Sequence, residues 1–519
     1  MSDSGLQETL TRNGQSGKLS KSSILEDYKL AVISREASIL GRKEVLTGKA
    51  KFGIFGDGKE LPQIAMARQF RNGDFRAGYY RDQTLMMAIG QLSLKEFFAQ
   101  LYAHPDITQE PHSGGRQMSS HYATRSLNPD GTWKNLLEMK NSSADISPTA
   151  GQMARLIGLA YASKIYRNHD GIEQPNQFSD NGNEIAFGTI GDSSTSEGIF
   201  WEAVNAAGVL GIPVVLSVYD DGYGISVSKK YQTVKESISK VLRGFERSKH
   251  QNGIAIFRAK AWDYKGLLKT YGEADRVARN EHVPVLVHVE EVTQPLGHST
   301  SGSHERYKSK QRLKFEENFN CNVKFREWIL KNEYATEQEL TGIEEEARKE
   351  VQQERNKAWK ALRDPIKEQV ETIKPLLDKL MEQTDGEISE AISKEKEKLK
   401  AAMNPIRKDV LIAAKKSLRY TRGMDLAVRK ELIELKDLLE ANNQDSYGSH
   451  VYSESEFSPL NVEEVPPSYP NNPQEVDGRV ILRDNFDRLM DKYPEIIIFG
   501  EDTGYLGGVN KSLEGLQEK

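Results

Sequence analysis

Runs of apolar residues bounded by polar, glycine-containing turns recur along the first 300 positions of the chain. Residues 184–190 and 213–219 are two such runs, and two more cover residues 254–259 and 283–289. Short, almost continuously apolar runs are typical of strands buried on both faces. Residues 263–280, between the last two runs, have the pattern of a crossover helix. This order of strand, helix and strand predicts an α/β fold with a parallel sheet and helices on both faces.

The remaining patterns divide the chain into further parts. The start is polar and rich in Ser, Gly and Lys, which predicts disorder. After the α/β domain and its helical tail, Lys, Glu, Arg, Ala and Leu dominate and predict long amphipathic helices, whereas the prolines that follow predict a linker. We therefore expect five parts. They are a disordered N-terminus (residues 1–22), an α/β domain with a helical tail (23–355), a charged helical insertion (356–440), a linker (441–472) and the start of a second α/β domain (473–519).

Composition narrows the class of protein. The formal charge of −5 over 519 residues gives no broad electrostatic footprint for nucleic acid. A single cysteine, Cys321, excludes an intrachain disulfide framework and a cysteine-rich metal site. The first residues lack the apolar core of a secretory signal, and no apolar run is long enough to cross a bilayer. We expect a cytoplasmic protein that binds neither nucleic acid nor a membrane.

A carboxylate follows each of two predicted neighbouring strands, at Asp192 and at Asp221. Ligands of open α/β sheets bind at the carboxyl ends of the strands, so we expect both side chains at one sheet edge. The flanking Gly191, Gly222 and Gly224 let backbone approach a phosphate closely. Carboxylate oxygens together with substrate phosphates are the ligands that Mg²⁺ prefers. The pattern therefore predicts a site for a divalent cation and a phosphate.

These residues also carry a resemblance to a known family. Gly191-Asp192, followed 29 residues later by Asp221, resembles the thiamine-diphosphate motif with the spacing found in the 2-oxo acid dehydrogenase family. Four more segments resemble that family in the same order: Tyr80-Arg81, Gly115-Arg116-Gln117-Met118, Ser147-Pro148-Thr149 and Gly297-His298-Ser299-Thr300. The resemblance covers residues of about 50 to 350 and is closest to the α subunit of the branched-chain type. It implies the thiamine-diphosphate-binding fold.

The resemblance also implies roles for individual residues. Mg²⁺ would be bound by Asp192, Asp221 and the carbonyl of Tyr223. The cofactor would be held by Tyr80, Arg81, Ser147, Thr149, Gly191, Ser193, Ser194, Tyr219 and His298. A planar guanidinium suits a diphosphate. Because the pKa of histidine lies near neutrality, His298 is also the candidate catalytic residue, for proton transfer or acylation of a lipoyl group.

Three positions depart from the pattern of the family. Asp221 stands where the family has a neutral Asn, which adds negative charge beside an anionic diphosphate and should weaken cofactor binding unless other cations compensate. Ser193 replaces the usual Gly after the aspartate, and Tyr219 takes a position that is often Arg or Glu. These departures leave the affinity for the cofactor and the preferred metal open.

The last fifty residues resemble the beginning of the β subunit of the same family. Residues 480–493 predict a helix and residues 495–500 a strand, which leads into Glu501-Asp502 and Gly507-Gly508-Val509. We expect an α subunit fused through a linker to a β subunit that is truncated here. The resemblance implies that the pyrimidine-binding half of the β domain supplies a glutamate needed to activate the cofactor, so this chain would be inactive alone.

The function implied by the resemblance is the decarboxylating dehydrogenase component of a 2-oxo acid dehydrogenase complex. Such a component oxidatively decarboxylates a 2-oxo acid and passes the acyl group to a lipoyl group on an acyltransferase partner. Branched-chain substrates are favoured over pyruvate, and a homo-oligomer is expected. Two alternatives stay open. One is another thiamine-diphosphate enzyme of the acetoin dehydrogenase or transketolase type, and the other is a non-catalytic scaffold built on the helical insertion.

Overall fold

A parallel sheet lies at the centre of the protein. The computed structural model describes residues 10–12, 15–17, 19–300 and 302–519. Its largest sheet has the strand order β4-β3-β5-β6-β10-β9, with every neighbouring pair parallel. The strands are β3 (Phe75–Ala77), β4 (Asn141–Ser142), β5 (Ala186–Gly191), β6 (Val214–Tyr219), β9 (Ala255–Lys260) and β10 (Val285–Glu290). The predicted α/β fold is confirmed, and its four predicted strands form within two residues of their expected limits.

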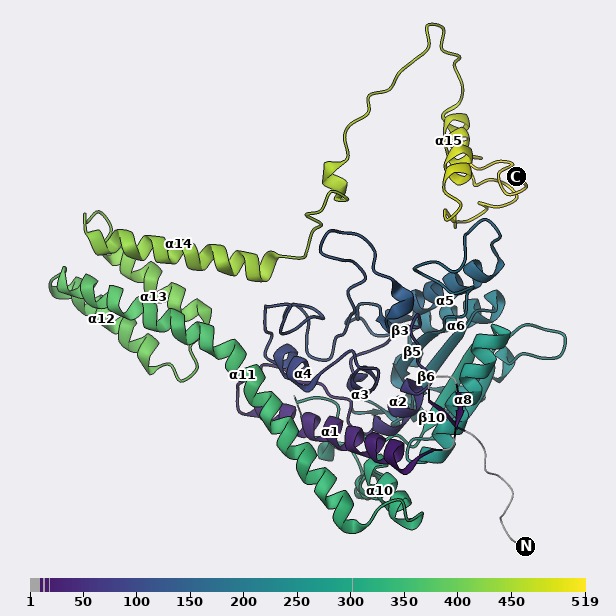
Figure 1. Cartoon of the computed structure of the whole chain (residues 1–519), viewed down its shortest axis with the longest axis horizontal. Helices are drawn as coiled ribbons and strands as arrows, with labels where there is room; N and C mark the ends of the chain where they lie inside the picture. The colour runs from purple at the N-terminus through teal and green to yellow at the C-terminus, as the bar shows by residue number, and fades with distance from the viewer. Residues whose placement is uncertain (1–9, 13–14, 18, 301) are drawn as a thin grey trace.

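Helices cover both faces of this sheet (Figure 1). Alternate residues of β6 point to opposite sides, so that Val214, Leu216 and Val218 pack in one core cluster while Val215 and Tyr219 pack in another. The first cluster includes α5 (Gln152–Asn168) and α6 (Gly198–Leu210), and the second includes α1 (Lys21–Leu46), α2 (Glu60–Ala67) and α8 (Tyr264–Glu281). Both helix layers therefore hold the strand ends in place.

Shorter elements complete the domain and carry its loops. They are α3 (Gln83–Ala88), α4 (Leu94–Leu101), η2 (Ser193–Ser196), the β7 (Tyr223–Gly224) and β8 (Val227–Ser228) hairpin, α7 (Ile238–Val241), α9 (Lys310–Asn318) and α10 (Cys321–Lys331). Two of these, η2 and the β7–β8 hairpin, directly follow β5 and β6. Among the described residues no helix is both long and apolar enough to cross a membrane.

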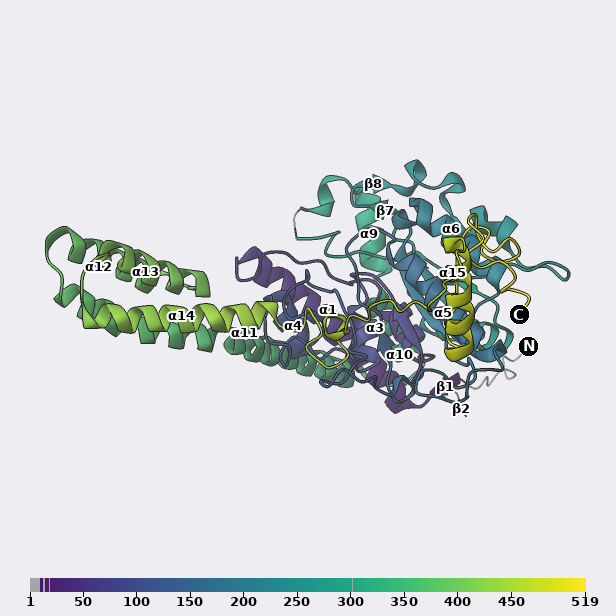
Figure 2. The ribbon, with the colours of Figure 1, turned by 90° about the horizontal axis from the view of Figure 1, so that it is seen from above.

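The charged insertion forms a bundle that projects from the α/β domain as an arm (Figure 2). Its helices are the distal half of α11 (Glu337–Glu382), α12 (Gly386–Ala401), α13 (Arg407–Tyr420) and α14 (Ala427–Gly448). The expected boundary between residues 355 and 356 falls inside α11, whose first half packs in the α/β core and whose second half packs in the arm. The expected start of the linker, residue 441, falls inside α14, because the helix continues to Gly448.

Near the N-terminus, part of the expected disorder is not observed. Residues 10–12 (β1) and 15–17 (β2) pair as antiparallel strands, and α1 begins at Lys21 with the Ser20 side chain as its N-cap. The prediction of disorder is therefore wrong for these segments, because backbone hydrogen bonds between the strands and a capped helix end order them. The rest of residues 1–18 lies outside the described residues.

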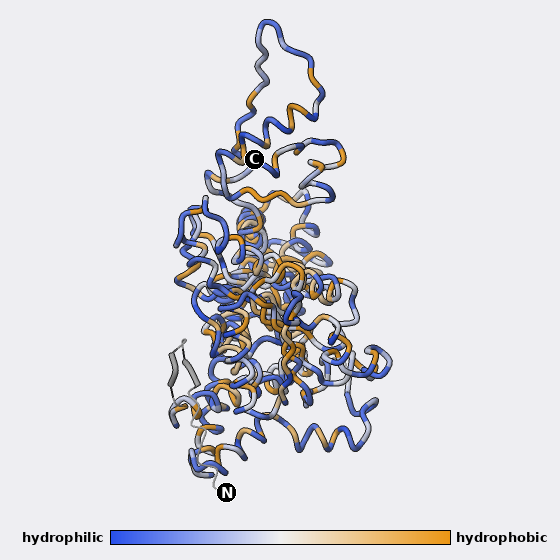
Figure 3. The backbone as a smooth tube through the Cα atoms, turned by 90° about the vertical axis from the view of Figure 1, so that its right-hand side faces the viewer, coloured by the Kyte–Doolittle hydropathy of each residue, from blue (hydrophilic) through white to orange (hydrophobic). Residues whose placement is uncertain are grey.

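The C-terminal segment contains the predicted helix but lacks the predicted strand. Helix α15 (Gly478–Lys492) lies close to its expected position, whereas residues 495–500 form no strand, and the Phe499 side chain is exposed. No strand in the described part of the chain pairs with this segment, so its backbone groups cannot form a ladder. Phe499 instead contacts Tyr161 of α5, with ring centroids 5.8 Å apart. Figure 3 shows apolar stretches in this segment, outside the central core.

Candidate functional site

Asp192 and Asp221 lie at the same edge of the sheet. Strands β5 and β6 are parallel neighbours, and Gly191 pairs with Tyr219 in their register. Asp192 follows Gly191 directly, and its backbone N–H donates to the Tyr219 carbonyl at 3.1 Å. Asp221 begins the turn after β6. The structure thus brings together the two carboxylates that the sequence spacing predicted to meet.

The Asp192 carboxylate is buried and incompletely satisfied. Its residue is only 6% exposed, and Oδ2 has no hydrogen-bond partner among the described residues. Burial, and next the nearby Asp221 and Asp220 carboxylates, raise the pKa of Asp192 well above its ordinary value. A divalent cation would remove both penalties, because it binds the free oxygen and stabilises the charged form. The donor set therefore fits a hard metal ion.

Asp220 is neutralised by residues from other elements. Lys229 donates to both of its carboxylate oxygens at 3.0 and 2.7 Å, and His288 Nε2 lies 3.0 Å from Oδ2. Burial acts to raise the pKa of Asp220, but these contacts with His288 and Lys229 outweigh it and lower the pKa. The carboxylates that remain available to a cation are those of Asp192 and Asp221.

Asp221 and Tyr223 form a tight turn beside Asp192. The Tyr223 N–H donates to Asp221 Oδ1 at 3.1 Å, and Arg312 Nη2 donates to the Asp221 carbonyl at 2.8 Å. A Cβ on Gly224 would lie 2.2 Å from Ser193 Oγ, so any larger residue here would require the Ser193 side chain to move away. In the described residues no three His, Cys, Asp or Glu side chains converge as a metal site. A cation here would need backbone and phosphate oxygens as well.

Tyr80, Arg81 and His298 meet across the site from separate parts of the chain. Arg81, only 3% exposed, donates to the carbonyls of Phe55 at 2.6 Å and of His298 at 2.9 Å. Its guanidinium lies 5.2 Å from the centre of the Tyr80 ring, and the rings of Tyr80 and His298 are 6.5 Å apart. The turn after β3 and the loop after β10 are thereby joined.

The imidazole of His298 is held in its neutral form. Burial, followed by the positive charge of Arg81, lowers the pKa of His298 to about 4, although Asp221 acts in the opposite direction. At neutral pH the ring therefore carries one proton, and its second nitrogen can accept another. Such a group can accept or relay a proton at the site.

The other predicted residues lie at different depths. Gly191 is the last residue of β5, the half-buried Ser193 and Ser194 lie in the turn that follows it, and Ser147 and Thr149 are exposed. The Ser147 hydroxyl lies 3.1 Å from Nε2 of His121, whose pKa is lowered by burial. Tyr219 is fully buried, with its ring 6.3 Å from that of Tyr79, so its side chain belongs to the core beneath the turn.

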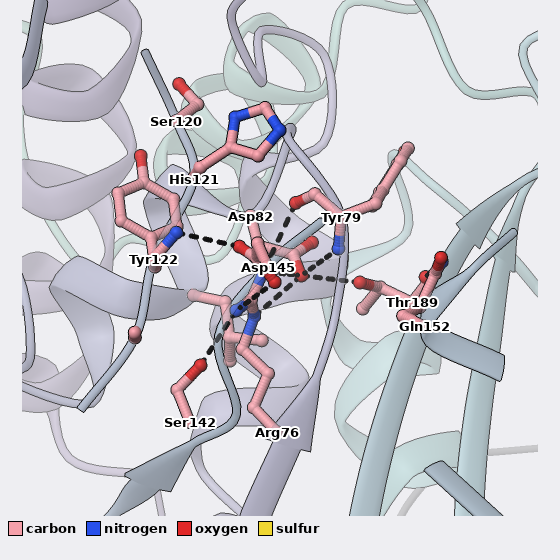
Figure 4. A network of polar contacts seen from close by, with 12 residues as sticks. Arg76, Tyr79, Asp82, Ser120, His121, Tyr122, Ser142, Asp145, Gln152 and Thr189 are labelled. Carbon is pink, nitrogen blue, oxygen red and sulfur yellow. Dashed lines mark hydrogen bonds and ion pairs between the residues drawn. The ribbon is translucent and has the colours of Figure 1, made fainter. Parts of the chain in front are cut away.

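A buried ionic network beneath the site was not anticipated from the sequence. Figure 4 shows the Arg76 guanidinium between the carboxylates of Asp82 and Asp145. Arg76 Nε donates to Asp82 at 2.8 Å, and its two terminal nitrogens donate to Asp145 at 3.0 and 2.9 Å. Asp82 directly follows Arg81, so the network fixes the turn that carries Tyr80 and Arg81. An arginine inside a short strand was the available signal.

Lys59 is the second residue that sequence reasoning missed. It follows Gly56-Asp57-Gly58 at the start of α2, and it is only 1% exposed. Its Nζ donates to the Gln294 side chain and lies 3.7 Å from Asp221 Oδ2. Burial lowers the pKa of Lys59 below its ordinary value, and the nearby Asp221 carboxylate opposes this effect without outweighing it. The glycine-rich turn before it was the only local signal of a functional position.

Comparisons with known proteins identify the family and several relatives of this chain. The family model described as "Dehydrogenase E1 component" matches residues 28–367. The chain is 25% identical over 350 residues to 2-oxoisovalerate dehydrogenase subunit alpha 1, mitochondrial, of Arabidopsis thaliana, a match covering 67% of this chain and 66% of that protein. It is 28% identical over 194 residues to the 2-oxoisovalerate dehydrogenase subunit alpha of Bacillus subtilis, covering 37% and 49%.

Relatives named for pyruvate are found as well. The pyruvate dehydrogenase E1 component subunit alpha of Rickettsia typhi is 28% identical over 162 residues, or 31% of this chain and 47% of that protein. In these three relatives the match spans between about half and two thirds of their own length. The family match itself covers well over half of the present sequence. The chain belongs to the dehydrogenase E1 component family.

Proposed function

We propose that this chain is the decarboxylating component of a 2-oxo acid dehydrogenase complex and binds thiamine diphosphate, on which its family depends. One observation carries the proposal. The buried Asp192 carboxylate lies at the same sheet edge as Asp221 and has an oxygen for which no described residue is a hydrogen-bond partner. A purely structural aspartate in that position would be paired, because a buried unpaired charge is costly. A metal-bound diphosphate would satisfy it.

The residues around this edge divide into a metal side and a diphosphate side. Mg²⁺ would be held by Asp192, Asp221 and the Tyr223 carbonyl. The diphosphate would be held by the polar groups of Tyr80, Arg81, Ser147, Thr149, Ser193 and Ser194, close to Gly191. The fully buried Tyr219 would support the turn from below. When bound, thiamine diphosphate supplies the nucleophilic carbon and the electron sink for loss of CO₂.

His298 would serve as the proton-transfer group. Its lowered pKa keeps the imidazole neutral, and the Arg81 contact to its carbonyl positions the loop that carries it. A neutral ring can donate its one N–H proton, for example to the sulfur released when the lipoyl disulfide is opened, and its second nitrogen can then take up a proton again. We therefore assign it to proton transfer during decarboxylation or acylation of the lipoyl group.

Substrate and partners are assigned from the resemblance and the relatives together. Two of the relatives described above are named for 2-oxoisovalerate and one for pyruvate. We propose a branched-chain 2-oxo acid as the preferred substrate and pyruvate as the second. The acyl acceptor would be a lipoyl-bearing acyltransferase, and the pyrimidine half of the cofactor would be held by a β-subunit-like domain in a homo-oligomer. Exposed apolar side chains on α15, such as Ile481 and Leu482, are consistent with a further domain packing there.

Calorimetric titration tests the proposal directly. Thiamine diphosphate with Mg²⁺, and pyrophosphate with Mg²⁺, are titrated into the unaltered chain and into Asp192→Ala. We expect Asp192→Ala to lose at least tenfold in affinity for both ligands, since it removes one of two carboxylate ligands. Asp130→Ala, in an exposed loop, is the matched control and should bind as the unaltered chain does. Equal binding by Asp192→Ala would overturn the metal site.

A further inference from the structure

The side chain of Lys59 is directed to one carboxylate of the site. A Cβ on Gly58, which has φ +86°, would lie 1.8 Å from the Thr293 carbonyl oxygen, so this turn presses against the segment after β10. The next residue is Lys59, whose side chain is almost fully buried and ends 3.7 Å from Asp221 Oδ2. Its position is thus imposed by a backbone contact that only glycine permits.

Other cations around Asp221 are already engaged. Lys229 pairs with Asp220, and Arg312 pairs through Nε with Glu316 at 2.7 Å while it binds only the backbone carbonyl of Asp221. The Arg81 contacts described above are to carbonyl oxygens. Among the described residues, the Asp221 carboxylate forms its ion pair with Lys59. Lys59 is therefore the cation placed to balance it.

The charge at position 221 needs such a balance. The thiamine-diphosphate motif that this segment resembles has a neutral Asn at the position of Asp221. This chain instead has a carboxylate there, beside Asp192 and at the place where an anionic diphosphate would bind. Two carboxylates and a diphosphate repel one another in a site of low polarity. A buried ammonium 3.7 Å away offsets one of those charges. Lys59 is thus the cation that can compensate the additional negative charge of Asp221.

We propose that Lys59 and Asp221 form a charge pair that takes the place of the neutral residue of the motif and adapts the site to Mg²⁺ and a diphosphate. This inference rests on the proposed function, because it names a binding residue of the same site. Lys59 holds the extra carboxylate electrically balanced, and through Gln294 it also contacts the segment that leads to His298. Gln294 in turn donates to Asp57 at 3.0 Å, so these contacts close back on the turn that carries Lys59.

A double-mutant cycle tests the pair. The variants are Lys59→Met, Asp221→Asn and the combination of both, with Lys265→Met on the exposed face of α8 as the matched control. Each single variant leaves the other charge of the pair, the buried Lys59 or the partly buried Asp221, without its partner and should lower the thermal unfolding midpoint of the ligand-free chain. The double variant leaves neither charge, and it should unfold at a higher temperature than the two single changes predict when added.

Binding of pyrophosphate with Mg²⁺, measured by calorimetry, tests the role of the pair toward the cofactor. Lys59→Met should weaken binding by about 10- to 100-fold, the range found when a group supporting a metal ligand is removed. Asp221→Asn added to it should restore at least tenfold, since the repelling charge is then gone. Lys265→Met should bind as the unaltered chain does.

Each remaining outcome decides one part of the proposal, either the pairing of the two residues or their role in binding. Additive changes in the unfolding midpoint would show that the two residues do not pair. A coupled midpoint with unchanged affinity in Lys59→Met would leave a structural ion pair and overturn its role in binding. If the unaltered chain binds no Mg²⁺-pyrophosphate while the midpoints remain coupled, the proposed function fails and the pair stands. If Lys59→Met alone does not fold and the double variant does, the coupling is demonstrated.

Discussion

The ion pair at the centre of the α/β domain is buried, whereas a pair of similar length on the helical arm is exposed to solvent. In the α/β domain, Arg76 is paired with Asp82 and Asp145, and all three side chains are at most 1% exposed. In the arm, Lys394 and Glu390 also pair at 2.8 Å, but both side chains are about two thirds exposed. Unpairing a buried charge is costly, whereas water replaces an exposed partner at little cost. Ion pairs therefore position backbone in the domain, while an apolar seam holds the arm together.

One helix belongs to both regions and shows the same contrast along its length. Near its middle, Arg355 of α11 donates to the buried Glu44 at 2.9 Å, which also accepts a hydrogen bond from Tyr102. Further along, Lys374 pairs with Glu371 on the same exposed surface, while Ile373 and Leu377 face the arm's core. The helix thus changes its means of attachment where it leaves the domain.

The largest expected effect is that of breaking the buried network. Arg76→Met leaves Asp82 and Asp145 without their partner, and we expect a loss of about 3–5 kcal/mol in the free energy of unfolding. Urea unfolding at pH 7 measures it. Arg76 is the main partner that opposes the effect of burial on Asp145, whose pKa is nonetheless raised to about 6. A loss below about 1 kcal/mol would mean that buried charge does not stabilise this domain.

An intermediate effect is expected from acidification. Burial, and next Arg167, lower the pKa of His282 to about 4, so the unfolded chain binds a proton on this residue between about pH 6.5 and 4 while the folded chain does not. Its contribution to stability is thus present above pH 6.5 and is lost as the pH falls toward 4. His282→Asn, which suits the left-handed conformation there, should lose less stability between pH 7 and 5.

Hydrogen exchange followed by mass spectrometry resolves this pH effect by region. No histidine occurs between residues 337 and 448, so the helices of the arm should keep their protection better than α8 does when the pH falls from 7 to 5. The matched control for His282→Asn is His169→Asn, which should lose as much stability between pH 7 and 5 as the unaltered chain does. Equal loss of protection in both regions would contradict the assignment of this sensitivity to the α/β domain.

The smallest effect is expected in the arm. Lys394→Ala removes an exposed pair one helical turn apart, and we expect no resolvable change in the free energy of unfolding, because water replaces the exposed partner. Urea unfolding under the conditions used for Arg76→Met gives the direct comparison. A loss as large as that of Arg76→Met would show that the arm, too, depends on its ion pairs.

The sequence predicted the central sheet and the position of its two carboxylates. The apolar runs that became β5 and β6 were predicted as buried strands, and because parallel neighbours end at the same edge, Asp192 and Asp221 were expected to lie close together. The resemblance also pointed to Tyr80, Arg81 and His298, which the structure brings into one place. These features follow from local patterns and from strand direction alone.

Other features depended on the path of the chain. Residues 495–500 have the pattern of a strand, but in the part of the chain that the structure describes no strand pairs with them, so the pattern did not decide their structure. Sequence alone did not show that Asp220 would be neutralised by His288 or that Asp221 would face Lys59, 162 positions earlier. Periodicity is a local property that burial enforces, whereas the pairing of charges depends on which distant segments the fold brings together.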